Sequence, residues 1–120
     1  MLLRYCWGQS PHSPMSLNTL AKQIVAMYER HGWHLVRALV CEENREDLEK
    51  VFPGVPVEQA PGNALWFSRP SHGHREAWEL RLLAETPYAL FQTFSVEDDE
   101  EYKAGVRADM VRKMSEQMKT

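Results

Sequence analysis

Three apolar segments follow one another in the second half of the chain, separated by turn-forming residues. They span residues 64–69, 77–83 and 88–96. In the middle segment Trp78, Leu80 and Leu82 share one face. Glu79 and Arg81 share the other face, and this period of two is typical of a strand with one solvent-facing side. The three segments therefore predict consecutive antiparallel strands joined by short turns.

A helix followed by a strand is predicted in the first half of the chain. Apolar residues recur at helical spacing over Leu17–Arg30, with Ser16 available as the N-cap and Gly32 suited to the position after the helix. Residues 33–41 then carry apolar side chains on both faces. This pattern indicates a strand that is covered on two sides or lies centrally in its sheet.

A short charged helix and a brief strand or loop should come next. Residues 42–52 place Leu48 and Phe52 four positions apart, and Pro53 then ends any helix. Residues 55–58 could add a brief strand. Its proline lacks the amide hydrogen that a ladder requires, which favours the edge of a sheet or a loop.

The C-terminal segment carries the clearest helix signals in the sequence. Ser95 with Asp98 three residues later resembles a capping box. Residues 97–101 are all acidic, and they would lie at the positive end of the helix dipole. Arg112 and Lys113 lie toward the negative end, so both ends match the dipole.

The order of elements, α-β-α-β-β-β-β-α, predicts an α+β fold. We expect a two-layer α/β sandwich, with three helices packed on one face of a mostly antiparallel sheet of four to five strands. If residues 33–58 form a crossover unit, one strand pair would be parallel and right-handed. Residues 15–120 should form this single domain, after an irregular N-terminal extension over residues 1–14.

Charge and composition exclude several classes of partner. The 120 residues carry 14 Lys and Arg against 17 Asp and Glu, a net charge of −3, so no basic footprint for nucleic acid is expected. No apolar run is long enough for a membrane span or a signal peptide, and we expect no membrane association. Cys6 and Cys41 are too few for a disulfide scaffold, which favours reduced thiols in a cytoplasmic protein.

The densest group of polar side chains lies in the loop of residues 69–75. Its candidate ligand-binding residues are Arg69, Ser71, His72, His74 and Arg75. Arginines and loop amides suit a carboxylate or phosphate anion. The two histidines could instead share a metal ion, with a third ligand from Cys41, His34 or an acid. A solvated hairpin loop without a ligand is the third interpretation, and the identity of any metal stays open.

A methionine stripe on the last helix is the second candidate. Met110, Met114 and Met118 recur every four residues and could contact a protein partner or a second copy of the chain. The alternative is that the stripe completes the core of the domain.

Catalysis has no comparable signal in the sequence. Nucleophile elbows, phosphate loops, zinc-protease helices and paired-cysteine metal motifs are all missing from the 120 residues, so no catalytic residue or cofactor is predicted. The leading hypothesis is a small non-enzymatic binding or protein-interaction module acting through a sheet edge, the 69–75 loop or the methionine face. The alternative is a small metal- or anion-binding protein or enzyme centred on that loop.

Overall fold

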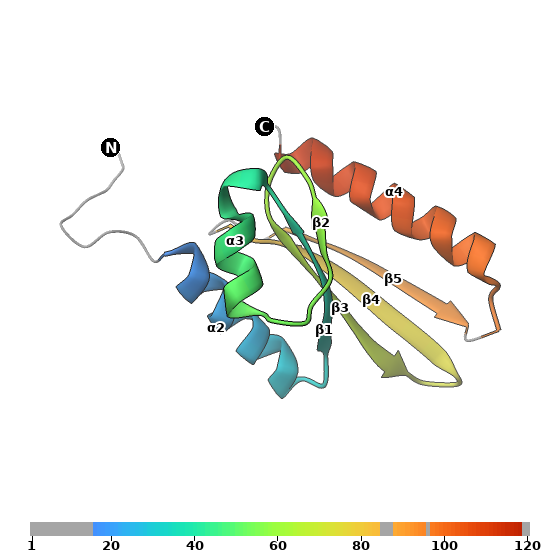
Figure 1. Cartoon of the computed structure of the whole chain (residues 1–120). Coiled ribbons are helices and arrows are strands. Elements are labelled where there is room, and N and C mark those ends of the chain that lie inside the picture. The colour runs from blue at the N-terminus through green and yellow to red at the C-terminus, as the bar shows by residue number, and fades with distance from the viewer. Residues whose placement is uncertain (1–15, 85–87, 96, 119–120) are drawn as a thin grey trace.

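The computed structural model describes residues 16–84, 88–95 and 97–118, so the expected N-terminal extension lies outside the described residues. In this part of the chain three helices pack around one sheet, as can be followed in Figure 1. The elements in chain order are α2 (Leu17–Arg30), β1 (His34–Val40), α3 (Glu42–Val51), β2 (Val57–Gln59), β3 (Ala64–Ser71), β4 (Arg75–Leu82), β5 (Ala89–Ser95) and α4 (Glu100–Met118).

The five strands form one sheet in the order β2-β1-β3-β4-β5. Its three pairs β1–β3, β3–β4 and β4–β5 are antiparallel. The pair β1–β2 is parallel, and α3 makes the crossover between its two strands. The structure therefore confirms the α+β class, the order of elements and the mostly antiparallel sheet. The brief strand expected near residues 55–58 is β2, and it lies at an edge of the sheet, as Pro56 indicated.

The helices cover both faces of the sheet, which differs from the expected packing on one face. Alternate residues of β3 enter separate cores: Leu65 and Phe67 pack with α2, whereas Trp66 packs with α4. Helices α2 and α3 thus lie on one face and α4 on the other (Figure 1). The cause is that β1 and β3 are central strands whose two faces are both apolar, so each face needs its own cover.

Helix α2 forms as its sequence predicted. The amide of Thr19 donates to the Ser16 hydroxyl at 3.1 Å, which confirms the N-cap. Ile24 and Tyr28 are buried on the face toward the sheet. Gly32 follows the helix with a φ of 85°, a left-handed conformation that glycine adopts without steric cost.

Helix α4 begins five residues after Ser95, the expected cap. The amide of Tyr102 donates to the Asp99 carboxylate at 2.8 Å, so Asp99 is the side chain that caps the helix. The amide of Ser95 donates to Asp98 at 3.0 Å, a bond that closes the turn before the helix. The pairing that suggested a capping box is real, but it ends β5 and does not start α4.

The burial of the methionine stripe leads to a stability prediction. Replacing Met114, which is 0% exposed, with alanine leaves a cavity between α4 and the sheet and should cost about 2–5 kcal/mol of unfolding free energy. Met27→Ala on α2, where the side chain is 37% exposed, should cost about 1 kcal/mol or less. Urea denaturation of both variants checks the difference, and equal costs would contradict the packing.

Candidate functional site

The expected loop of residues 69–75 is shorter in the structure: residues 69–71 end β3, residues 72–74 form the turn at the tip of the hairpin, and Arg75 begins β4. Ser71 and Arg75 pair across the base of this turn, and both are exposed, as are His72 and His74 in the turn. His74 has a φ of 59°, an uncommon conformation for a residue other than glycine. Among the described residues no group of three His, Cys, Asp or Glu side chains could hold a metal ion. Anion binding at this tip stays a prediction.

Arg69 is separated from the rest of that loop. Its guanidinium donates to the backbone carbonyl of His31 at 2.8 Å and lies 5.4 Å from the ring centre of Trp33. Arg69 thereby connects β3 to the C-terminal end of α2, where a cation also complements the helix dipole. The structure therefore brings Ser71, His72, His74 and Arg75 together and places Arg69 elsewhere.

The methionine stripe lies between α4 and the sheet. Met110 and Met114 are buried in the core that includes Trp66 and Trp78, and Met118 packs against the same core. An added Cβ at Gly62 would lie 2.9 Å from Met118 Cγ, so the end of α4 is also closely packed. A partner could reach Met110 and Met114 only if α4 left the sheet. Contact through Met118 stays a prediction.

Cys41 belongs to a small hydrogen-bonded junction. Its Sγ donates to Asn44 Oδ1 at 2.9 Å, and its amide donates to Asn63 Oδ1 at 3.0 Å. The Asn63 side chain also donates to Asn44 Oδ1 at 3.0 Å. The half-buried thiol therefore helps to fix the start of α3 against the residue before β3, which is a structural role.

Tyr28 forms the main polar contact beneath α2. Its hydroxyl donates a short hydrogen bond to Glu79 on β4, while its ring stacks on Phe67 with 4.1 Å between ring centres. Burial, and next the bond to the Glu79 carboxylate, raise the pKa of Tyr28 to about 12. The pair fixes α2 to the side of the sheet where β4 carries charged residues.

The free edge of β5 is the most distinctive surface of the molecule. The amide of Leu82 donates to the Tyr88 carbonyl at 2.9 Å, and such pairs recur at every second residue of an antiparallel ladder. Ala89, Phe91 and Thr93 therefore direct their N–H and C=O groups away from β4. The segment Ala89–Ser95 contains no charged residue and no proline.

Two exposed aromatic side chains flank this edge, one on each face of the sheet. Phe91 is 58% exposed and lies on the α2 side, with its ring centre 6.2 Å from that of Trp33. Tyr102 is 52% exposed and lies on α4. Between α4 and Gln92 there is a hollow of about 340 Å³ that includes Tyr102 and Gly105.

The opposite edge of the sheet lacks these properties. Strand β2 has only three residues, and one of them is Glu58. Pro56 immediately precedes the strand. Short length, a charge and a proline are the usual protections of an edge against further pairing. The two edges of one sheet therefore differ sharply in how well they would accept another strand.

Sequence reasoning named a sheet edge as a possible binding surface but did not identify the edge. The usable signal was the uncharged run in residues 88–95, which contrasts with Glu79 and Arg81 in the preceding strand. What was missing was the strand order, because an uncharged run is also typical of a central strand.

Comparisons with protein-family models, with curated proteins and with solved structures each found no match to this chain. Within the described residues, no helix has both the length and the apolar composition needed to cross a bilayer.

The raised pKa of Tyr28 predicts a loss of stability at high pH. Between pH 10 and about 12 the unfolded chain loses the phenol proton while the folded chain retains it, so rising pH favours the unfolded state. The unfolding free energy should fall by about 2 kcal/mol over this range from Tyr28. Denaturant unfolding of the protein and of Tyr28→Phe at several pH values measures the difference. Parallel pH profiles would contradict the assignment.

Proposed function

We propose that this protein is a non-enzymatic interaction module whose β5 edge pairs with the β5 edge of a second copy of the chain. The observation that carries the proposal is the open edge of Ala89–Ser95, seven residues without charge or proline. Such an edge offers unpaired backbone donors and acceptors to another strand. An unprotected edge of this kind is a template for another strand, and a second copy of the chain is always present.

The hydrogen-bonding pattern of β5 suits pairing with itself. An antiparallel pair centred on Phe91 joins Phe91 to the partner's Phe91, and Ala89 to the partner's Thr93. These are the residues whose N–H and C=O groups face outward. The Thr93 carbonyl now accepts a 3.3 Å bond from Gln92 Nε2, which the stronger backbone bond would replace. The Ser95 amide is bonded to Asp98, which limits the pairing at that end.

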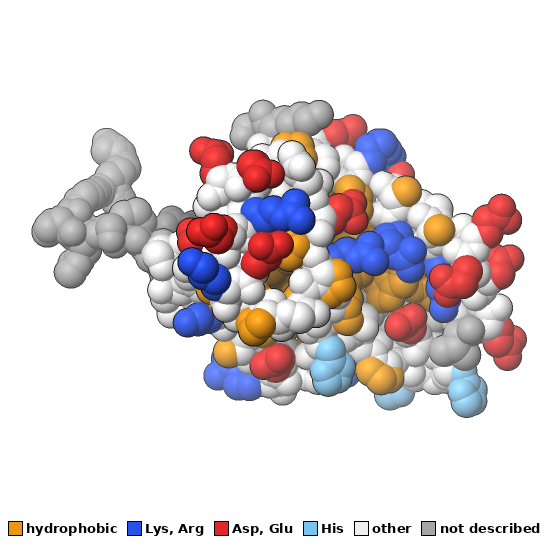
Figure 2. Space-filling view, in the orientation of Figure 1, with side chains coloured by type: hydrophobic (Ala, Val, Ile, Leu, Met, Phe, Trp, Pro, Cys, Tyr) orange, Lys and Arg blue, Asp and Glu red, His pale blue; other side chains and the backbone are white. Residues whose placement is uncertain are grey.

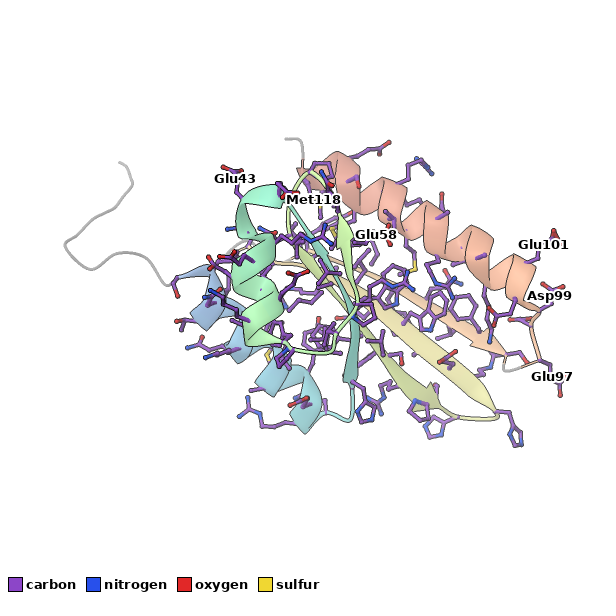
Figure 3. The ribbon with its side chains drawn as sticks, viewed as in Figure 1. Glu43, Glu58, Glu97, Asp99, Glu101 and Met118 are labelled. Carbon is purple, nitrogen blue, oxygen red and sulfur yellow. The ribbon has the colours of Figure 1, made fainter. Side chains whose placement is uncertain are left out.

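The charges on α4 favour the same antiparallel arrangement. Figure 3 shows Glu97, Asp99 and Glu101 at the N-terminal end of this helix. Because α4 runs antiparallel to β5, a two-fold axis through Phe91 brings that end toward the C-terminal half of the partner's helix. That half carries Arg112 and Lys113, which pair with Asp109 and Glu116 of their own helix. The antiparallel arrangement thus keeps the two acidic helix ends apart and places each against a half of α4 that is neutral overall.

The first test is the mass in solution of the protein and of an edge variant. Sedimentation equilibrium should give twice the chain mass for the protein and a single chain mass for Phe91→Lys, because a lysine there places a charge in the pairing surface. Met27→Lys replaces another exposed apolar residue, on α2, and should remain dimeric. A monomeric parent protein, or dimers of all three proteins, would contradict the proposal.

Amide hydrogen exchange tests the register directly. The amide protons of Ala89, Phe91 and Thr93 should exchange slowly in the dimer. In the Phe91→Lys variant, those of Ala89 and Thr93 should exchange rapidly. The amides of Leu90 and Gln92 bond to β4 in either state and serve as the internal control. Rapid exchange at Ala89 and Thr93 in a dimeric sample would assign the dimer to another surface.

A further inference from the structure

A second surface lies on the other side of α4, away from the β5 edge. Two adjoining hollows lie here: one of about 320 Å³ between this helix and strands β1 and β2, and one of about 210 Å³ between the helix and strands β1, β3 and β4. Both are lined by the same two arginines, Arg37 of β1 and Arg107 of α4. Figure 2 shows basic side chains beside hydrophobic ones in this part of the surface. We propose that the groove binds a small organic monocarboxylate with an apolar body, held by Arg37 and Arg107.

A contact with an aromatic ring holds the Arg107 side chain in place, but no acidic side chain of the described residues balances its charge. Its guanidinium lies 4.9 Å from the ring centre of Trp78, a cation–π contact that orients the group over the buried indole. Among the described residues no carboxylate lies within ion-pair distance of Arg107. A half-buried guanidinium with its donors uncommitted to an acid is available to an anionic ligand.

Arg37 is held only loosely by its own partner. Its ion pair with Glu58 measures 3.6 Å, and the two side chains are partly exposed, so water screens the contact. The register of β1 against β3 shifts between Leu35 and Arg37, an irregularity that changes how side chains leave the strand. Arg37 could therefore turn from Glu58 to a ligand at little cost.

The charge of the groove selects the class of anion. Glu58 and Glu76 line the hollows together with the two arginines, and Lys103 lies 3.9 Å from Glu76. Three cations against two carboxylates leave one positive charge. A single carboxylate matches this charge, whereas a phosphate dianion would meet repulsion from the two glutamates. A guanidinium also binds carboxylates through two parallel hydrogen bonds.

The walls of the groove favour an apolar body on the ligand. Ala104 and Ala108 are small and leave space beside α4, and Val111 extends that wall. Val36 lies on the strand side with 41% of its surface exposed. Trp66 and Trp78 form the base of the smaller hollow. Apolar walls with a few convergent polar groups are the usual composition of a small-molecule site.

The test is a titration with 2-naphthoate, followed by the indole N–H signals of Trp66 and Trp78 in the NMR spectrum. We expect saturable shifts of these two signals with a dissociation constant of about 1 mM or tighter. Arg107→Gln and Arg37→Gln should each weaken binding by about tenfold or more. Arg112→Gln, which changes an exposed arginine on the same helix, should bind as the parent protein does.

Two further ligands distinguish the contribution of the negative charge to binding from that of the apolar ring. The neutral 2-naphthylmethanol and inorganic phosphate should both bind at least tenfold more weakly than 2-naphthoate. Equal binding of the alcohol, tighter binding of phosphate, no saturable shift, or unchanged binding by Arg107→Gln would each overturn the proposal. Thermal unfolding of each variant confirms that the domain is intact. Because Phe91→Lys leaves this groove untouched, it should bind 2-naphthoate normally whether or not the dimer exists.

Discussion

The structure depends on one strand that is buried on both faces. In β3 the four consecutive residues Ala64, Leu65, Trp66 and Phe67 are all buried, and they alternate between two cores. Helices on one side of the sheet cannot bury all the apolar side chains of such a strand, because every second one would then face water. The position of β3 in the middle of the sheet therefore requires α2 on one face and α4 on the other.

The helices do not cover the whole sheet, and the parts that they leave uncovered are the β5 edge and the groove of Arg37 and Arg107. Three helices are too few to cover five strands on both faces, so each helix protects the apolar centre and leaves margins open. On one margin of α4 the sheet ends in the uncharged β5. On the other margin the helix stands beside β1, and Arg37 and Arg107 occupy the gap. The interaction surface and the groove thus have a common structural origin.

Local features were predictable from the sequence because they depend on neighbouring residues. Helix α2 matches its predicted bounds, and Ser16 caps it. The turn of Ser95 and Asp98 formed, although the side chain that caps α4 is that of the next residue, Asp99. What depends on distant segments was not predictable: the layer count, the strand order, and the convergence of Arg37 with Arg107, which lie 70 positions apart in the chain. The spacing of residues along the sequence does not indicate that two residues so far apart lie close together in the fold.

The topology also has a consequence for the order in which the chain folds. Strands β3, β4 and β5 are successive, and their pairs close short loops, whereas β1 must reach β3 across α3 and β2. Local contacts of this kind form faster than distant ones, so the topology favours early formation of the three-stranded meander. Until β1 docks, β3 is an edge as apolar as β5. A slow docking of β1 would then leave the nascent sheet open to aggregation on two sides. Because α2 and β1 precede the meander in the chain, they are synthesised before it, which shortens that interval.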